Sequence, residues 1–250
     1  REAHLGLGAN YTHTAPFQAP HHTSSASALI GGSRLKPGLV SMAHNGILFL
    51  DEAPEYRRDT LEALREPLEE GIIRVHRACG TVTFPARFQL VMAANPCPCG
   101  YRMNPSRCRC SPSAQRRYMQ KLSGPLLDRI DLQVTLSVVD STELFSTAQN
   151  ESSASVLKRV EAARRLALSR GQRVPNSQIQ DTHILSQTAP TNETQSILKD
   201  RFPQLNMSIR GVFRALRVAR TIADLDVSAT IQPRHLFEAL SYRIHDLQNA

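Results

Sequence analysis

Short, mostly apolar runs mark the first half of the chain. Residues 47–50 and 87–95 are apolar stretches bounded by polar residues, a pattern typical of strands buried in a parallel sheet. Between them, leucines at three- and four-residue spacing predict a helix over 56–71, and two alternating runs predict a β-hairpin over 72–84. Residues 123–136 predict the end of a helix that leads into a third strand. These patterns together predict a mixed α/β unit.

The second half of the chain follows a helical period. Apolar residues recur every three or four positions over 155–171, 208–225 and 232–247. Ser208 stands where an N-cap is expected, and Pro233 stands in the first turn of the last of these helices. The apolar stripe predicted for the middle helix consists of Ile209, Val212, Phe213, Leu216, Ala219 and Ile222. The second half therefore predicts an all-helical unit.

A polar stretch rich in Ser and Thr separates the two halves and predicts a domain boundary. We expect an α/β domain over 1–140, a linker over 141–154 and a helical domain over 155–250. A chain of 250 residues is long enough for both domains to bury a core. It has no run of about 18 apolar residues and no signal peptide, so we expect a soluble, cytoplasmic protein without a membrane partner.

Positive charge is concentrated in one segment. The chain has 30 Lys and Arg against 22 Asp and Glu, a formal net charge of +8, yet no acidic residue occurs between Glu70 and Asp128. The basic residues of that segment are Arg74, Arg77, Arg87, Arg102, Arg107, Arg109, Arg116, Arg117 and Lys121. Such a segment attracts a polyanion, which favours contact with nucleic acid. The alternative is a solvated surface whose acidic partners lie elsewhere in the fold.

Two carboxylates and an amide follow the predicted strands. Asp51 and Glu52 come directly after the apolar run 47–50, where one carboxylate can hold Mg²⁺ and the other can orient a water for attack on a γ-phosphate. Asn95 ends the neighbouring strand, where its amide can bind the attacking water and a phosphate oxygen. The alternatives are carboxylates that cap the next helix and an asparagine that forms a turn.

Two arginines are further candidates. The guanidinium of Arg129 matches the geometry of a phosphate and can stabilise transition-state charge when a neighbouring subunit supplies it. Arg210 stands in the first turn of a predicted helix, from which it could face a nucleotide. The alternatives are a local salt bridge of Arg129 with Asp128 or Asp131, and a solvated helix charge at Arg210.

Four of the five cysteines form two Cys-x-Cys pairs: Cys97, Cys99, Cys108 and Cys110. Four thiolates in so short a span can close a tetrahedral zinc site. Free thiols and a redox disulfide are the alternatives. Arg102, Arg107 and Arg109 lie in the same loop, so a zinc knuckle there could present positive charge to DNA. The adjacent pair His21 and His22 lacks nearby ligands in the sequence and predicts packing or phosphate-facing residues rather than a metal site.

Several long strings point to one family. They are "APHHTSSASALIGG", "GLVSMAHNGILFLDEAPEY", "LEALREPLEEG", "TVTFPARFQLVMAANPCPCGY", "RCRCSP", "LSGPLLDRIDLQV" and "RVARTIADL". The chain resembles the magnesium-chelatase-like AAA+ ATPases of bacteria, in particular the ComM/YifB competence-protein family. The resemblance implies a partial AAA+ core with a helix-2 insert over about 17–40 and a pre-sensor hairpin over 72–84, followed by a helical lid domain.

The resemblance also implies roles for single residues. Asp51 and Glu52 match the Walker B pair, Asn95 the first sensor, Arg129 the arginine finger and Arg210 the second sensor. The hairpin makes Arg74, His76 and Arg77 candidates for contact with a DNA strand in a central pore. These roles require ATP and Mg²⁺ as cofactors, and zinc is expected in addition at the four cysteines.

The implied activity is that of a homo-hexameric, ATP-driven DNA motor. Members of the family act on branched DNA when transforming DNA is integrated by recombination, so the expected reaction is ATP hydrolysis coupled to branch migration or unwinding. The phosphate-binding pattern G-x-x-x-x-G-K-[ST] is absent from these 250 residues, so we expect this stretch alone to bind ATP poorly. Two alternatives are a chelatase-type remodeller of a protein partner and a zinc-dependent DNA-binding module without activity of its own.

Overall fold

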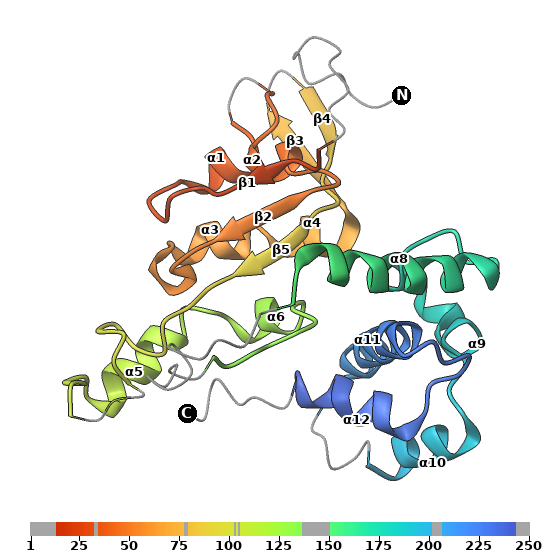
Figure 1. Cartoon of the computed structure of the whole chain (residues 1–250). Coiled ribbons are helices and arrows are strands. Elements are labelled where there is room, and N and C mark those ends of the chain that lie inside the picture. Colours follow the sequence, from red (N-terminus) through yellow and green to blue (C-terminus); the bar gives the residue numbers. More distant parts are fainter. Residues whose placement is uncertain are drawn as a thin grey trace. The chain divides into compact units, whose positions relative to one another are not determined.

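The fold of the chain consists of two compact units. The structure is a computed structural model, and it describes residues 14–32, 35–77, 80–102, 104, 106–136, 151–201 and 207–243. The first unit ends at Ile130 and the second begins at Asp131 (Figure 1). Residues 151–154 of the predicted linker belong to the second unit, where helix α8 begins at Ser153. Residues 141–150 of that linker lie outside the residues that the structure describes.

A three-stranded parallel sheet forms the centre of the first unit. Its strands are β1 (Phe17–Gln18), β2 (Ile47–Leu50) and β5 (Gln89–Met92), in the order β1-β2-β5. The register pairs Leu50 with Met92, so β2 and β5 end side by side. Leu48 and Leu50 point into the core and are fully buried. The predicted α/β fold class is confirmed, with β2 as the central strand.

The helices of the first unit are short. They are α1 (Ala26–Ile30), α2 (Leu39–Met42), the 3-10 turn η1 (Ala53–Glu55), α3 (Arg58–Glu62), α4 (Arg65–Glu70), α5 (Pro112–Met119) and α6 (Gly124–Leu127). The prediction of one helix over 56–71 was wrong, because the helix is divided between α3 and α4. Pro67 explains the division: it has no N–H for the carbonyl of Ala63 four residues earlier, and its ring disfavours a continuous helix there.

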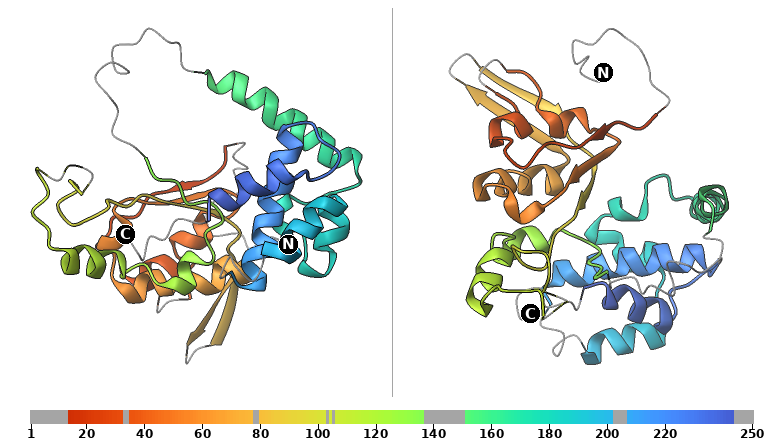
Figure 2. Two further views of the ribbon diagram at one scale, coloured as in Figure 1. Left: turned by 90° about the horizontal axis from the view of Figure 1, so that it is seen from below. Right: turned by 60° about the vertical axis from the view of Figure 1, so that its left-hand side comes forward.

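The predicted hairpin is confirmed. Strand β3 (Ile72–Arg77) pairs antiparallel with β4 (Gly80–Pro85), from Ile72 opposite Pro85 to Arg77 opposite Gly80. Ile73, Val75 and Phe84 are buried on one face of this hairpin. Figure 2 shows the two strands extending beyond the three-stranded sheet.

The third predicted strand does not form in the described part of 123–136. Residues 131–136 are neither strand nor helix, and Leu136 is 83% exposed. The N–H of Gln133 donates to the carbonyl of Tyr242 at 2.8 Å, and Asp131 binds Arg214 at 3.0 Å. Gln133 and Asp131 are therefore bonded to α11 and to the end of α12 instead of to a neighbouring strand. The alternating pattern of this segment does not predict these partners.

The second unit is helical, as predicted. Its elements are α8 (Ser153–Ser169), the 3-10 turns η2 (Asn176–Gln178) and η3 (Asp181–His183), α9 (Ile184–Thr188), α10 (Asn192–Arg201), α11 (Ile209–Leu225) and α12 (Pro233–Ser241). The N-cap at Ser208 is confirmed, since its hydroxyl accepts from the N–H of Gly211 at 3.1 Å. None of the helices in the described ranges is long and apolar enough to cross a membrane.

The buried face of α11 differs from the predicted stripe. Ile209 is 63% exposed, whereas Arg220 and Asp224 are buried beside the apolar residues of the helix. Asp224 accepts two hydrogen bonds from Arg170, at 2.5 and 3.0 Å, and also pairs with Arg220 at 3.0 Å. Arg220 in turn donates to the backbone carbonyls of Ser228 and Ala229. The buried charges are thus paired and fix the segment after α11 to the helix.

Candidate nucleotide site and cysteine cluster

Two carboxylates follow directly after β2. Asp51 and Glu52 are both exposed, and Oδ1 of Asp51 accepts from the N–H of Glu52 at 2.8 Å. Glu52 has φ 50° and ψ 43°, the left-handed region. That conformation costs a non-glycine residue on the order of 1 kcal/mol, so surrounding contacts must hold it. The N–H of Ala53 donates to the carbonyl of Ala93 at 2.9 Å and fixes this turn to the end of β5.

Asn95 lies beyond the end of β5. The N–H of Ala93 donates to the carbonyl of Leu50 at 2.9 Å, which extends the pairing of the two strands past β2. The structure therefore brings Asp51, Glu52 and Asn95 to the same edge of the sheet, where parallel α/β sheets bind their ligands. A Cβ built at Gly100 would lie 4.0 Å from Cγ of Asn95. The asparagine side chain accordingly lies near the loop that carries the cysteines.

The structure places Arg129 in contacts within the first unit. Its guanidinium donates to the carbonyl of Pro125 at 2.7 Å and pairs with Glu69 of α4. Asp131, one of the two partners considered from the sequence, pairs with Arg214 instead. The Arg129 side chain is only 14% exposed, so it would have to leave Glu69 to reach a phosphate on another subunit.

Arg210 belongs to the second unit. It lies in the first turn of α11, two residues after the Ser208 N-cap, and is exposed. A cation at a helix N-terminus is electrostatically unfavourable, because that end carries partial positive charge. The role of Arg210 as a second sensor stays a prediction.

Two hairpin side chains have partners inside the first unit. Arg74 donates to Glu70 at 2.5 Å and to Glu66 at 3.1 Å, and the hydrogen bond to Glu70 is the main reason why the pKa of Arg74 is raised. His76 Nδ1 lies 2.9 Å from the hydroxyl of Thr81 across the hairpin. The side chain of Arg77 lies outside the described residues. Any contact of Arg74 with DNA must therefore compete with two carboxylates.

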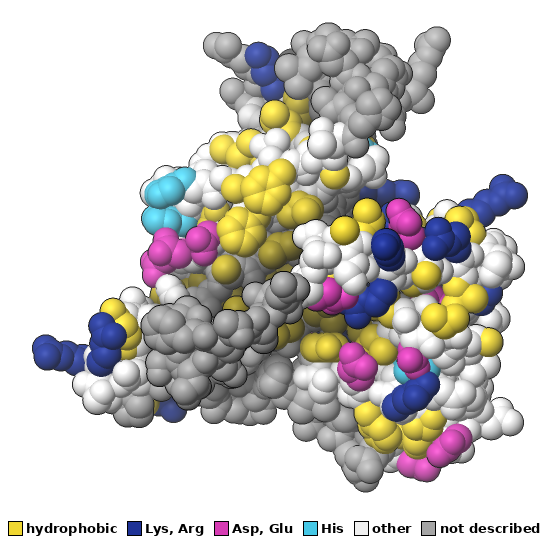
Figure 3. Space-filling model, viewed as in Figure 1, with side chains coloured by type: hydrophobic (Ala, Val, Ile, Leu, Met, Phe, Trp, Pro, Cys, Tyr) yellow, Lys and Arg dark blue, Asp and Glu magenta, His cyan; other side chains and the backbone are white. Residues whose placement is uncertain are grey.

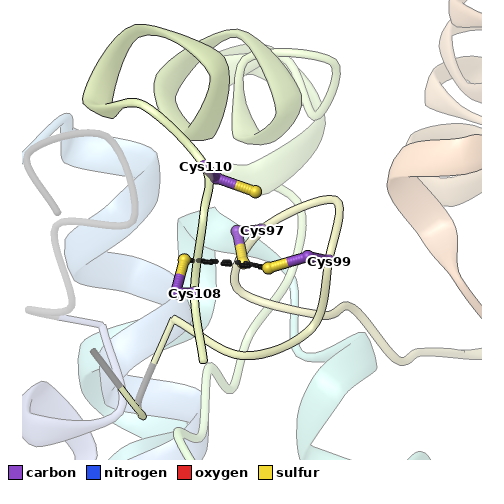
Figure 4. Close-up of side chains that lie close together, drawn as sticks. All are labelled: Cys97, Cys99, Cys108 and Cys110. Atoms are coloured by element: carbon purple, nitrogen blue, oxygen red, sulfur yellow. Dashed lines mark hydrogen bonds between the residues drawn. The ribbon is translucent and has the colours of Figure 1, made fainter. Parts of the chain in front are cut away.

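The four cysteines converge on one point (Figure 4). Their sulfur atoms all lie within 4.8 Å of one another, and Sγ of Cys97 is 3.4 Å from Cys99 and 3.9 Å from Cys108. Zinc–sulfur bonds of about 2.3 Å in a tetrahedron place sulfur atoms about 3.8 Å apart. The cluster therefore fits a tetrahedral zinc ion, and all four cysteines are free thiols in this structure.

Local backbone geometry builds this cluster. Gly100 has φ 76°, which glycine adopts without strain, and its N–H donates to the carbonyl of Cys97 at 3.0 Å. Gln115 of α5 donates to Sγ of Cys108 at 3.6 Å and to the carbonyl of Cys110 at 3.1 Å. Gln115 was not predicted as a site residue from the sequence. The signal for it is its position four residues after the Ser111 N-cap, one helical turn beyond Cys110.

The thiols titrate as a group. The backbone N–H of Tyr101 and the thiol of Cys97 hydrogen-bond to Cys99 and lower its pKa to about 6. The hydrogen bond with Cys99 raises the pKa of Cys110 to about 11. The pKa of Cys99 is therefore lowered while those of Cys108 and Cys110 are raised, as expected for closely spaced groups of like charge.

Arginines surround the cysteine loop. Arg107 and Arg109 are exposed, and Arg102 is half-buried. The guanidinium of Arg107 lies 4.0 Å above the ring of Tyr101, which orients it without neutralising its charge. The loop thus presents cations beside an exposed aromatic ring, a combination suited to a nucleic-acid strand.

These features define an α/β ATPase-like core followed by a helical unit, and comparison with known proteins identifies the family. Residues 3–144 match the family model of magnesium chelatase subunit ChlI, and residues 150–243 match that of the ChlI C-terminal part. The chain therefore belongs to the magnesium chelatase ChlI family of AAA+ proteins, which confirms the resemblance seen in the sequence.

Individual relatives extend over most of the chain. It is 44% identical over 233 residues to the uncharacterized protein YifB of Escherichia coli, covering 92% of this chain and 46% of YifB. It is 42% identical over 230 residues to competence protein ComM of Haemophilus influenzae, covering 91% of this chain and 45% of ComM. DNA replication licensing factor mcm2 of Schizosaccharomyces pombe is 23% identical over 243 residues, covering 86% of this chain and 28% of mcm2. The chain spans less than half the length of these relatives.

Proposed function

We propose that this chain is part of a homo-hexameric motor that hydrolyses ATP to drive branch migration or unwinding of DNA during integration of transforming DNA. The observation that carries the proposal is the meeting of Asp51, Glu52 and Asn95 at the ends of β2 and β5. In this proposal Asp51 holds Mg²⁺ through its water shell, Glu52 orients the attacking water and Asn95 senses the γ-phosphate.

The remaining roles depend on other parts of the assembly. Arg129 serves as the arginine finger toward a neighbouring subunit, and Arg210 in the lid domain acts as the second sensor. The expected core over 1–140 and lid over 155–250 are proposed to correspond to the two compact units, which divide between Ile130 and Asp131. A phosphate-binding loop from another segment of the intact protein completes the ATP site.

DNA is the proposed polymer substrate. The relatives support it, since one is named a competence protein and another a DNA replication licensing factor. The arginines around Tyr101 supply a cationic surface, and zinc bound by the four cysteines fixes the shape of that loop. The hairpin residues Arg74, His76 and Arg77 add a second contact with the strand.

A second function is favoured by the family description, which names a chelatase subunit. In that case the hexamer would remodel a protein partner and would not require DNA.

The ATPase rate of the intact protein separates the two functions. We expect a four-way DNA junction to raise the steady-state rate severalfold, because the cysteine loop that would bind DNA continues directly from the strand end that carries Asn95. Duplex DNA without a branch serves as the control. A rate that no DNA form changes would contradict the DNA motor and favour the remodeller.

A further inference from the structure

One histidine lies against the proposed catalytic carboxylate. Nδ1 of His22 is 3.3 Å from Oε2 of Glu52, although the two residues are 30 positions apart in the sequence. Figure 3 shows a pair of histidine side chains beside carboxylates on this face of the first unit. The neighbouring His21 has a different partner, because its Nδ1 lies 2.9 Å from the hydroxyl of Thr23.

Two hydrogen bonds hold the segment that carries His22. On one side the hydroxyl of Tyr56 donates to the carbonyl of Pro20, and on the other the hydroxyl of Thr60 donates to the carbonyl of Ser24 at 3.4 Å. Tyr56 is almost fully buried, and both donors come from the segment directly after Glu52. The two segments are thus fastened together on either side of the His22–Glu52 contact.

Ring contacts restrict the orientation of the imidazole. The ring of His22 packs on that of His21 with centroids 4.1 Å apart, and it lies edge-on to Tyr56 at 6.4 Å. The imidazole is therefore fixed by packing rather than by the carboxylate alone. The side chain of Glu52, by contrast, is 51% exposed, and within the described residues the His22 imidazole is the cationic group that lies against its carboxylate.

We infer that His22 is a positioning residue for Glu52. A carboxylate only accepts hydrogen bonds, so the contact forms when Nδ1 carries a proton. In this inference the contact restrains Oε2, and Oε1 of the same carboxylate is the oxygen that orients the attacking water. The inference rests on the proposed function, because it requires Glu52 to orient the attacking water. It assigns a role to one of two histidines that the sequence indicated only as packing or phosphate-facing residues.

The test compares the same substitution at adjacent positions in the intact protein. His22→Phe keeps a ring against His21 and Tyr56 but removes the nitrogen that faces Glu52. We expect it to lower kcat for ATP about tenfold and to leave KM unchanged, because misplacing a catalytic group affects turnover more than binding. His21→Phe keeps the stacked pair and the Glu52 contact, and we expect kcat close to that of the unmodified protein.

Two further variants distinguish positioning from structural support. His22→Asn places an amide N–H at the distance from the backbone that Nδ1 has, and we expect it to recover most of the lost kcat. In the Glu52→Gln background His22→Phe should have no additional effect, since the group that it positions is already absent. Both results would separate loss of the His22–Glu52 contact from loss of folding, which thermal melting of each variant also checks.

Different kcat results would overturn the role of His22 and the proposed ATPase function. A normal kcat in His22→Phe, together with a strong loss in Glu52→Gln, overturns the role of His22 and leaves the proposed ATPase intact. A normal kcat in Glu52→Gln removes Glu52 from the mechanism and overturns the inference with it, whereas an unmodified intact protein that hydrolyses no ATP overturns the proposed function itself. Failure of His22→Asn to recover kcat, with an additive loss in the double variant, also overturns the positioning role.

Discussion

Glu52→Gln in the intact protein is expected to abolish ATP turnover while ATP still binds. Glutamine has the size of glutamate and fits the same left-handed turn, but it cannot accept a proton from the attacking water. General-base catalysis typically contributes about 10²–10⁴ in rate, so we expect kcat to fall at least about a hundredfold. Phosphate release measures turnover, and a fluorescent ATP analogue measures binding.

Glu55→Gln provides the matched control for this change. Glu55 lies three residues further along and contacts Lys121 at 3.7 Å, so it is a carboxylate of the same segment with a different partner. We expect its substitution to change kcat less than about twofold, as for most exposed ion pairs. Undiminished hydrolysis in Glu52→Gln would remove Glu52 from the proposed mechanism.

Removal of one cysteine sulfur is expected to abolish zinc binding. Protein purified without chelator should contain about one zinc per chain, because the four sulfur atoms already lie at the spacing that a tetrahedral site requires. Cys97→Ser should reduce the zinc content below about one tenth of an equivalent, since Cys97 is fully buried and supplies one of the four sulfur ligands. It should also lower the melting temperature of the first unit, because the metal links both halves of the loop. Elemental analysis and calorimetry measure the two effects.

Cys79→Ser is the control, since Cys79 is the fifth cysteine of the sequence and stands 18 residues before the first Cys-x-Cys pair. We expect this variant to keep its zinc. A zinc content below about half an equivalent in the unmodified protein, with DNA binding unchanged in both Cys97→Ser and Cys108→Ser, would contradict a zinc knuckle that presents the loop to DNA.

The sequence predicted those parts of the fold that depend on local patterns. Strands β2 and β5 and helices α11 and α12 follow from apolar runs, caps and a helical period, which act within a few residues. The third predicted strand does not form, because the partners of that segment are distant in the sequence. Gln133 is bonded to Tyr242, more than a hundred residues away, and no local pattern encodes such a partner.

The same distinction applies to the candidate site. Asp51 and Asn95 could be expected at one edge of the sheet because parallel strands end together, and the four cysteines could be expected to cluster because they are close in sequence. The contacts of His22 with Glu52 and of Arg129 with Glu69 join distant segments and were not predicted. The catalytic and sensing roles of these residues stay predictions.

The buried charges of α11 were also not predicted from the sequence. Arg220 and Asp224 lie four and eight residues after Leu216, on the buried face of α11, where a hydrophobic stripe predicts apolar side chains. The charges are accommodated there by Arg170 and by backbone carbonyls from the next loop, and these distant partners cannot be predicted from the helical period.

Branch migration by the intact protein tests the central claim most directly. A labelled four-way DNA junction is incubated with the intact protein, Mg²⁺ and ATP, and the separated duplex products are resolved on a gel. The account predicts products with ATP, none without ATP and none with Glu52→Gln. An intact protein that hydrolyses ATP in the presence of the junction yet leaves it unchanged would contradict the account.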